Sequence, residues 1–182
     1  MSAALPEQLS LPKCEKGVGS VITAIDSPNL IDGVRISANA LWPDDRGYFQ
    51  EVMRFGKGLP ADYPAASTQV SAAVSYPGTI KAFHYHLYQR DVWSPASGML
   101  QVALVDLRVA SPTFGRRNTL YIGMLRSWQV LIPAGVGHGY KVIGEQPAVL
   151  VYVTDRFYNP ADEGRIAYND PSINYDWEIQ HK

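Results

Sequence analysis

The fold is decided by the stretch GTIKAFHYHLYQRDVWSPASG at Gly78–Gly98, together with PAGVGH at Pro133–His138. Alternate residues of a β-strand point to the same face of a sheet. His84 and His86 are separated by one residue, so a strand would present both imidazoles on one side. Glycines and prolines flank both stretches, as expected for short strands joined by turns.

Asp91 and His138 could face that histidine pair from neighbouring strands. The candidate ligands for a divalent metal are then His84, His86, Asp91 and His138. Imidazole nitrogens and a carboxylate suit zinc, iron, manganese or nickel. A metal-free alternative makes His86 a hydrogen-bonded pocket residue and Asp91 a loop carboxylate that neutralises it.

Length and charge narrow the classes of protein. A chain of 182 residues is expected to form one domain with a substantial core. The formal net charge is −1, from 16 Lys and Arg against 17 Asp and Glu, so no general attraction to nucleic acid is expected. No apolar run approaches the roughly 18 residues of a membrane span, so no membrane partner is expected either.

The N-terminus has no basic start and no continuous apolar core, and so does not resemble a secretory signal. Cys14 is the one cysteine, which excludes an internal disulfide. A cytoplasmic location is therefore expected. Residues 1–22 are predicted to form an N-terminal arm or tail, and residues 23–182 a single domain.

Short runs rich in Val, Ile, Leu, Tyr and Thr predict β-strands between the glycines and prolines. They are Val34–Ala38, Tyr48–Arg54, Ser67–Ser75, Thr79–His86, Leu100–Leu107, Trp128–Ile132 and Ala148–Thr154. A helical repeat of apolar residues is nearly absent. Many short strands at regular spacing indicate an all-β sandwich or jelly-roll barrel.

Several longer stretches resemble the sequence motifs of a known enzyme family. They are DRGYFQE at 45–51, Gln69, KAFHYH at 81–86, VDLR at 105–108, SPTFG at 111–115, IPAGVGHGY at 132–140, and a tail running from Tyr158–Pro160 through Glu163–Gly164 to Asn169–Pro171. From about Val34 to Trp177 the chain resembles the dTDP-4-dehydrorhamnose 3,5-epimerase family of the cupin superfamily, as a divergent member. The histidine pair, carboxylate and later histidine also resemble the cupin metal pattern, with Asp91 where Glu is usual.

The resemblance implies an all-β cupin jelly-roll barrel (a double-stranded β-helix) with short peripheral helices. It also implies a homodimer, a sugar-nucleotide substrate, an active site in the barrel mouth and no metal cofactor. In this family a histidine removes the proton beside a 4-keto group, and a tyrosine returns one on the opposite face. Neutral His is a suitable base near pH 7, and Tyr, with a pKa near 10, is a suitable acid.

Transferred by position, His84 becomes the base and Tyr152 the acid. Four further residues are predicted to bind the substrate: Arg46, Gln69, Lys81 and His138. His138 and Lys81 would hold the enolate oxygen or the substrate, and Gln69 would hydrogen-bond the substrate. Arg46 would reach the diphosphate from this subunit or from a partner.

The chain departs from the family at the proposed site. Lys81 stands where the family has Arg, His86 where it has Gln, and Asp91 where it has Lys. The family's base pairs with an aspartate beyond the Trp177 region, and this sequence reaches Lys182 without that segment. That partner is therefore predicted to be missing, with Asp170 and Asp176 nearby in sequence.

Three functions stay open at this point. The first is an isomerase, a sugar-nucleotide epimerase acting on a dTDP-4-keto-6-deoxyhexose-like substrate with His84 as base. The second is a metal-dependent cupin enzyme, an isomerase, lyase or dioxygenase, in which His84 is a ligand and cannot be the base. The third is a non-catalytic sugar-binding barrel.

Overall fold

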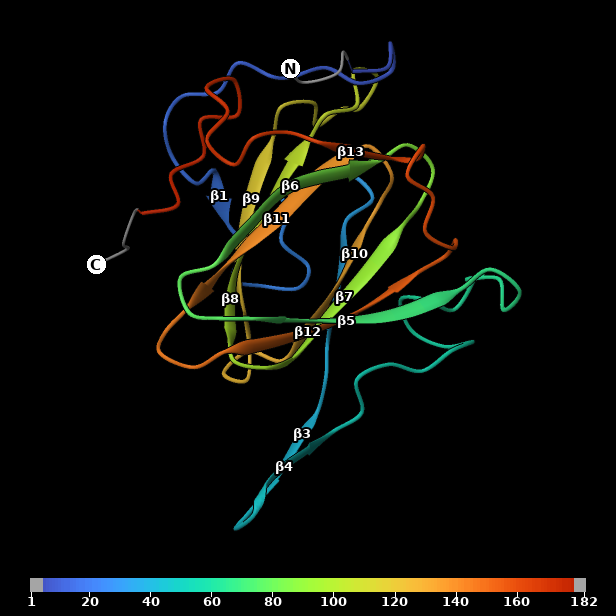
Figure 1. Ribbon diagram of the computed structural model, residues 1–182, viewed down its shortest axis with the longest axis vertical. Coiled ribbons are helices and arrows are strands. Elements are labelled where there is room, and N and C mark those ends of the chain that lie inside the picture. The colour runs from blue at the N-terminus through green and yellow to red at the C-terminus, as the bar shows by residue number, and fades with distance from the viewer. Residues whose placement is uncertain (1–4, 179–182) are drawn as a thin grey trace.

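Two β-sheets face each other in the computed structural model, which describes residues 5–178 (Figure 1). One sheet has six strands in the order β1-β9-β8-β11-β6-β13, and the other has five in the order β2-β10-β7-β12-β5. Strands close in sequence alternate between the two sheets, which is the arrangement of a jelly roll. The predicted all-β jelly-roll fold is confirmed.

The strands of the six-stranded sheet are β1 (Ser20–Val21), β6 (Ile80–His86), β8 (Met99–Asp106), β9 (Arg117–Gly123), β11 (Val136–Ile143) and β13 (Glu163–Arg165). The strands of the five-stranded sheet are β2 (Arg35–Ala38), β5 (Gln69–Ser75), β7 (Asp91–Ser97), β10 (Trp128–Ile132) and β12 (Ala148–Thr154). A separate hairpin consists of β3 (Leu41–Asp44) and β4 (Gly47–Gln50).

The core fills the space between the sheets. Its largest fully buried side chains include Leu100 and Leu104 of β8 and Ile122 of β9, which pack with Val130 and Leu150 of the facing sheet. Burial of such side chains removes apolar surface from water and supplies most of the favourable folding energy. The sheets therefore hold together along the half of the barrel that contains β8 and β9.

A second apolar cluster covers the outer face of the six-stranded sheet. Leu9 and Val18 from the N-terminal segment pack there with Tyr175 and Trp177 from the C-terminal segment. Strand β8 is consequently buried on both faces, which explains its nearly continuous apolar sequence. The segment before residue 23, predicted as an arm or tail, thus lies against the barrel from residue 5 onward and adds β1 to the sheet.

The predicted short peripheral helices are wrong for residues 5–178, where the segments between strands form turns and bends. The physical reason is local. In the longest such segment, Gly58 has a φ of 72°, and the prolines Pro60 and Pro64 lack the N–H that a helix interior requires. Single turns close instead, such as the bond from the Ser67 N–H to the Pro64 carbonyl.

The β3–β4 hairpin projects away from the barrel (Figure 1). Its register pairs Asp44 with Gly47, so the predicted turn at 43–47 is the hairpin tip, and Arg46 sits on that tip beside Asp44. Trp42 and Phe49 contact each other on the hairpin and remain exposed. No helix among the described residues is long and apolar enough to cross a bilayer.

Leu104→Ala should destabilise the fold, because Leu104 is fully buried between the sheets. A loss of about 2–5 kcal/mol in the free energy of unfolding is expected from the removed contacts and the cavity left behind. Urea titration measures it. Leu125→Ala is the matched control, since Leu125 is 84% exposed and its truncation should change stability by less than about 0.5 kcal/mol. Equal losses in both variants would contradict the assignment of the core.

Candidate functional site

A cavity of about 300 Å³ opens between the sheets beside the packed core, which contributes Trp93, Tyr140 and Leu150 to its wall. The six-stranded sheet contributes His84, His86 and His138 to its wall, and the five-stranded sheet contributes Asp91 and Tyr152. Its volume lies at the small end of the range of about 300–1,000 Å³ for small-molecule pockets. The cavity is therefore the candidate active site.

Two glycines allow the strands of this wall to approach closely. A Cβ at Gly139 of β11 would lie 2.3 Å from the Ala82 Cβ of β6, and a Cβ at Gly164 of β13 would lie 2.0 Å from the Tyr85 ring. Any side chain at either position would push the strands apart. Gly139 thus lets His138 pair with His84, and Gly164 brings the neighbouring Glu163 against β6.

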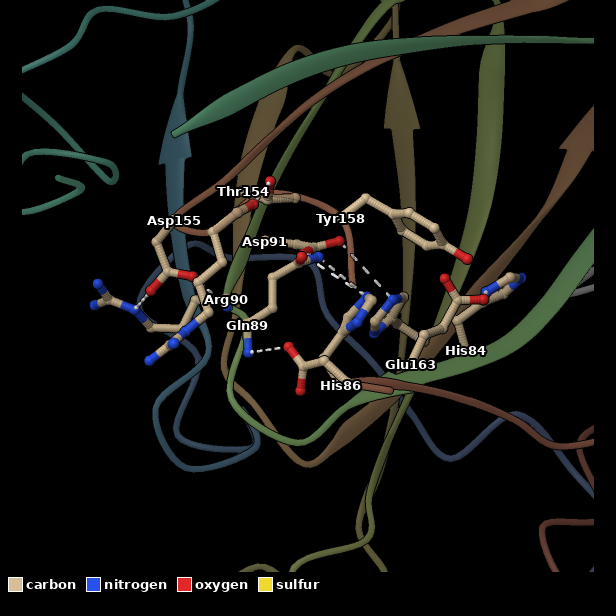
Figure 2. A network of polar contacts seen from close by, with 12 residues as sticks. His84, His86, Gln89, Arg90, Asp91, Thr154, Asp155, Tyr158 and Glu163 are labelled. Carbon is tan, nitrogen blue, oxygen red and sulfur yellow. Dashed lines mark hydrogen bonds and ion pairs between the residues drawn. The ribbon is translucent and has the colours of Figure 1, made fainter. Parts of the chain in front are cut away.

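His84 has a carboxylate partner. Its Nδ1 lies 3.1 Å from Oε1 of Glu163 (Figure 2). The same oxygen also accepts a hydrogen bond from Arg165. Partial burial alone would raise the pKa of the Glu163 carboxyl, but the bonds from Arg165 and His84 outweigh burial and hold it below its ordinary value. An ionised carboxylate only accepts hydrogen bonds, so Nδ1 of His84 carries the proton and Nε2 keeps its lone pair.

Burial lowers the pKa of His84 from its usual value, and Glu163 opposes that shift only in part. The imidazole is consequently neutral near pH 7 and can accept a proton. Its side chain remains about one third exposed, so a ligand in the cavity can reach it.

His138 is held in a defined tautomer. Its Nδ1 lies 3.0 Å from the Val136 carbonyl oxygen, which can only accept, so Nδ1–H is the donor and Nε2 is unprotonated. Burial, with the neighbouring histidines, lowers the pKa of His138 to about 3. His138 therefore has no donor to offer through Nε2, which weighs against the predicted role of holding an enolate oxygen.

Asp91 is a buried carboxylate between two imidazoles. Its Oδ1 lies 3.9 Å from His86 Nε2, and its Oδ2 lies 3.9 Å from His138 Nε2. It accepts a hydrogen bond from the Gln89 amide at 2.8 Å (Figure 2) and another from the Trp93 indole N–H at 3.2 Å. Burial raises the pKa of Asp91, against the stabilising effect of His86. His86, Asp91 and His138 place ligand atoms within 4.8 Å of one another.

The turn that leads from β6 to Asp91 is fixed by Asp162. Its carboxylate accepts the backbone N–H groups of Leu87, Tyr88 and Gln89 at 2.8–3.1 Å. A carboxylate that accepts several backbone donors is a strong local constraint. Asp162 thereby sets the position of Gln89 and the start of β7.

The other predicted site residues divide into two groups. Tyr152, Lys81 and Gln69 line the cavity, although the Gln69 amide is also engaged by the Tyr158 N–H and the Ser71 hydroxyl. Arg46 lies outside the cavity of its own chain, at the hairpin tip. Its predicted contact with a diphosphate stays a prediction.

Sequence analysis gave no site role to several residues of the cavity wall. Among them are Gln89, Tyr158, Glu163 and Arg165. Glu163 places a carboxylate against His84, whereas Asp170 accepts a hydrogen bond from the Ser172 N–H and Asp176 pairs with Lys16. The available signal was the Glu163–Gly164 pair, since a glycine beside a carboxylate marks a close approach of two strands.

A sequence profile described as dTDP-4-dehydrorhamnose 3,5-epimerase matches residues 28–182. The chain belongs to this family. Membership favours the epimerase interpretation over both the metal-dependent lyase or dioxygenase and the non-catalytic barrel. The predicted family is confirmed.

The relatives include a spore coat polysaccharide biosynthesis protein, SpsL of Bacillus subtilis, at 41% identity over 84% of this chain and 100% of that protein. A Legionella pneumophila epimerase solved with dTDP-4-keto-L-rhamnose matches at 28% identity and a TM-score of 0.70, covering 84% of this chain and 82% of that one. ChmJ, a 3'-monoepimerase of Streptomyces bikiniensis solved with dTDP-quinovose, matches at 28% identity and a TM-score of 0.72, covering 84% and 78%.

Proposed function

We propose that this protein epimerises a 4-keto sugar nucleotide, a dTDP-linked 6-deoxyhexose or a close analogue, at a carbon next to the ketone. One observation carries the proposal. His84 and Tyr152 belong to the two facing sheets and line the same cavity. A sugar ring between the sheets would have a base on one side and a hydroxyl acid on the other, as inversion of a carbon requires.

The proposed reaction begins at His84. Its Nε2 takes the proton from the carbon beside the ketone, and the C–H electron pair moves onto the carbonyl oxygen to form an enolate. The Tyr152 hydroxyl then gives a proton to the same carbon from the other face, and the enolate returns to the ketone. Glu163 holds the His84 ring and stabilises the imidazolium that forms.

Lys81 and Arg165 supply positive charge at the cavity mouth. The cavity accommodates a sugar ring, so the nucleotide diphosphate of a bound substrate would lie toward the mouth and these two side chains. Both keep exposed positions, which suits a contact with a charged group that remains partly hydrated.

We propose that the chain acts as a homodimer through the outer face of the five-stranded sheet and the β3–β4 hairpin. Val70 and Val74 are 55% and 64% exposed on the edge strand β5, and Trp42 and Phe49 are exposed on the hairpin. Apolar side chains gathered in this way favour association. A hairpin that crosses to a second subunit would carry Arg46 toward the partner's cavity.

Sedimentation velocity tests the dimer. The wild-type chain should sediment as a dimer, and Trp42→Ser with Phe49→Ser should shift it toward monomer, because the variant loses the apolar contact area of the hairpin. Val109→Ser is the control, since Val109 is apolar, 53% exposed and lies on the connection between β8 and β9, where its N–H binds the Gln8 carbonyl. A wild-type monomer at micromolar concentration would contradict the proposal.

His84→Asn should strongly slow the exchange of solvent deuterium into a dTDP-4-keto-6-deoxyhexose. A general base contributes about 10²–10⁴ in rate, so exchange measured by mass spectrometry should fall by that factor. Circular dichroism should show an unchanged fold. The proposed function would be overturned if His84→Asn exchanged deuterium at the wild-type rate. It would also be overturned if the wild-type protein exchanged deuterium into no 4-keto sugar nucleotide.

Glu163→Gln should lower kcat for exchange at least about tenfold, with a smaller change in KM. The variant keeps the shape of the side chain but removes the negative charge that stabilises the His84 imidazolium. Glu145→Gln is the matched control on an exposed turn. If both variants kept the wild-type kcat, Glu163 would have no part in the reaction.

A further inference from the structure

His86, Asp91 and His138 form a buried group for which the proposed reaction has no use. They lie on three strands, β6, β7 and β11, and each is less than a tenth exposed. Each presents a ligand-type atom toward the others, and all three line the cavity beside His84. Two imidazole nitrogens and a carboxylate are a common protein ligand set for a catalytic transition metal, which leaves further positions open to substrate.

Asp91 is a buried carboxylate whose neighbouring ionisable groups are two histidines, His86 and His138, each 3.9 Å away. Within residues 5–178 no lysine or arginine lies within ion-pair distance of it, and its two hydrogen bonds come from neutral donors on Gln89 and Trp93. A buried carboxylate charge is costly unless a cation compensates it. The site therefore calls for added positive charge, from a proton or from a metal ion.

The tautomer of His138 points to a metal. Because Nδ1–H donates to the Val136 carbonyl, the lone pair of Nε2 faces Asp91 across 3.9 Å, too far for a hydrogen bond. An imidazole whose remote N–H is bound to a backbone carbonyl is the usual arrangement of a metal-ligating histidine. A buried lone pair facing a buried carboxylate would otherwise be repulsive.

Side-chain movements of about one ångström would bring the three ligands to one ion. Ligand atoms around a tetrahedral ion with bonds of about 2.0–2.2 Å lie about 3.3–3.6 Å apart. The two carboxylate–imidazole distances of 3.9 Å, which involve different oxygens of Asp91, must therefore shorten slightly, and the widest separation in the group, up to 4.8 Å, must shorten by about 1.2 Å. The Gln89 amide, 3.3 Å from His86 Nε2, must rotate aside or turn its oxygen inward.

We propose that His86, Asp91 and His138 bind one divalent transition-metal ion, such as Zn²⁺, and that His84 stays outside this ligand set as the base. Glu163 hydrogen-bonds His84, which is not one of the three residues whose ligand atoms lie within 4.8 Å of one another. This removes the conflict between a ligand role and a base role for the same histidine. A bound divalent cation supplies Lewis-acid charge stabilisation for a ketone oxygen. Such an ion would also change the local charge from that of one carboxylate to a net positive value, which would favour the negative charge that develops on the enolate oxygen when His84 removes a proton.

Isothermal titration of the full chain with Zn²⁺ after chelator treatment tests the site. The wild-type protein should bind one Zn²⁺ per chain. Mutation of a residue that hydrogen-bonds to a metal ligand lowers metal affinity by about 10–100-fold. His86→Gln and Asp91→Asn remove the ligands themselves, so each should lower Zn²⁺ affinity by at least about 100-fold. His84→Asn should bind as the wild type does, and Asp26→Asn, on an exposed loop, is the matched control.

Asp91→Glu guards against a simple loss of fold, because it restores a carboxylate and should recover Zn²⁺ binding that Asp91→Asn loses. Co²⁺ provides a second readout: the wild-type protein and His84→Asn should give the same visible absorption spectrum. The inference is overturned if the wild-type chain binds no Zn²⁺, if Asp91→Asn binds as tightly as the wild type, or if His84→Asn loses binding as His86→Gln does.

The role of the ion rests on the proposed epimerase function, and the two fail separately. Metal-free wild-type protein that exchanges deuterium at the full rate would overturn the role of the ion and leave the epimerase intact. Protein that binds Zn²⁺ at these three residues but exchanges no 4-keto sugar nucleotide would support the metal site and contradict the epimerase.

Discussion

The antiparallel pairing of β11 and β13 on either side of β6 is the constraint on which the site depends. Gly139 and Gly164 allow this pairing, since a Cβ at either position would overlap its neighbour on β6. The result is that His84 lies opposite His138 on one side and next to Glu163 on the other. Backbone hydrogen bonds along three strands thereby fix the relative positions of His84, His138 and Glu163, which come from distant parts of the chain.

The same wall separates two chemical environments. At His84 the imidazole is partly exposed and has a carboxylate that fixes its tautomer, as a base in contact with substrate requires. Deeper in the cavity, His86, Asp91 and His138 are nearly sealed from water, where an uncompensated charge is costly. One strand supplies both environments, because alternate residues of β6 share a face and differ in depth. The base and the proposed metal ligands can therefore act together on one bound ketone.

The sequence predicted the strands whose burial imposes a clear composition. Strands β10 and β12 have the predicted bounds, and β8 differs by one residue at each end. Strands β7, β9 and β11 escaped prediction because they carry Pro95, Asn118 or paired glycines, which are poor strand formers in isolation. Tertiary contacts override those preferences: Pro95 lies beside a register shift between β7 and β12, where a missing N–H is tolerated.

The site was predicted as far as residue identity and spacing allow. The pattern of His84, His86, Asp91 and His138 was enough to place them together, and Tyr152 was found from the resemblance. The pairing of Glu163 with His84 could not be read from the sequence, since these residues are distant along the chain and meet through the register of β13 with β6. Hydrogen bonds fix the tautomers of His84 and His138, and they support the proposed separation of the base from the metal ligands.

A crystal structure with a bound 4-keto sugar nucleotide tests the central claim most directly. The account predicts that the sugar ring lies between the sheets, with the carbon beside the ketone facing Nε2 of His84 and its opposite face toward Tyr152. A sugar bound outside this cavity, or a His84 ring turned away from Glu163 and from the sugar, would contradict it.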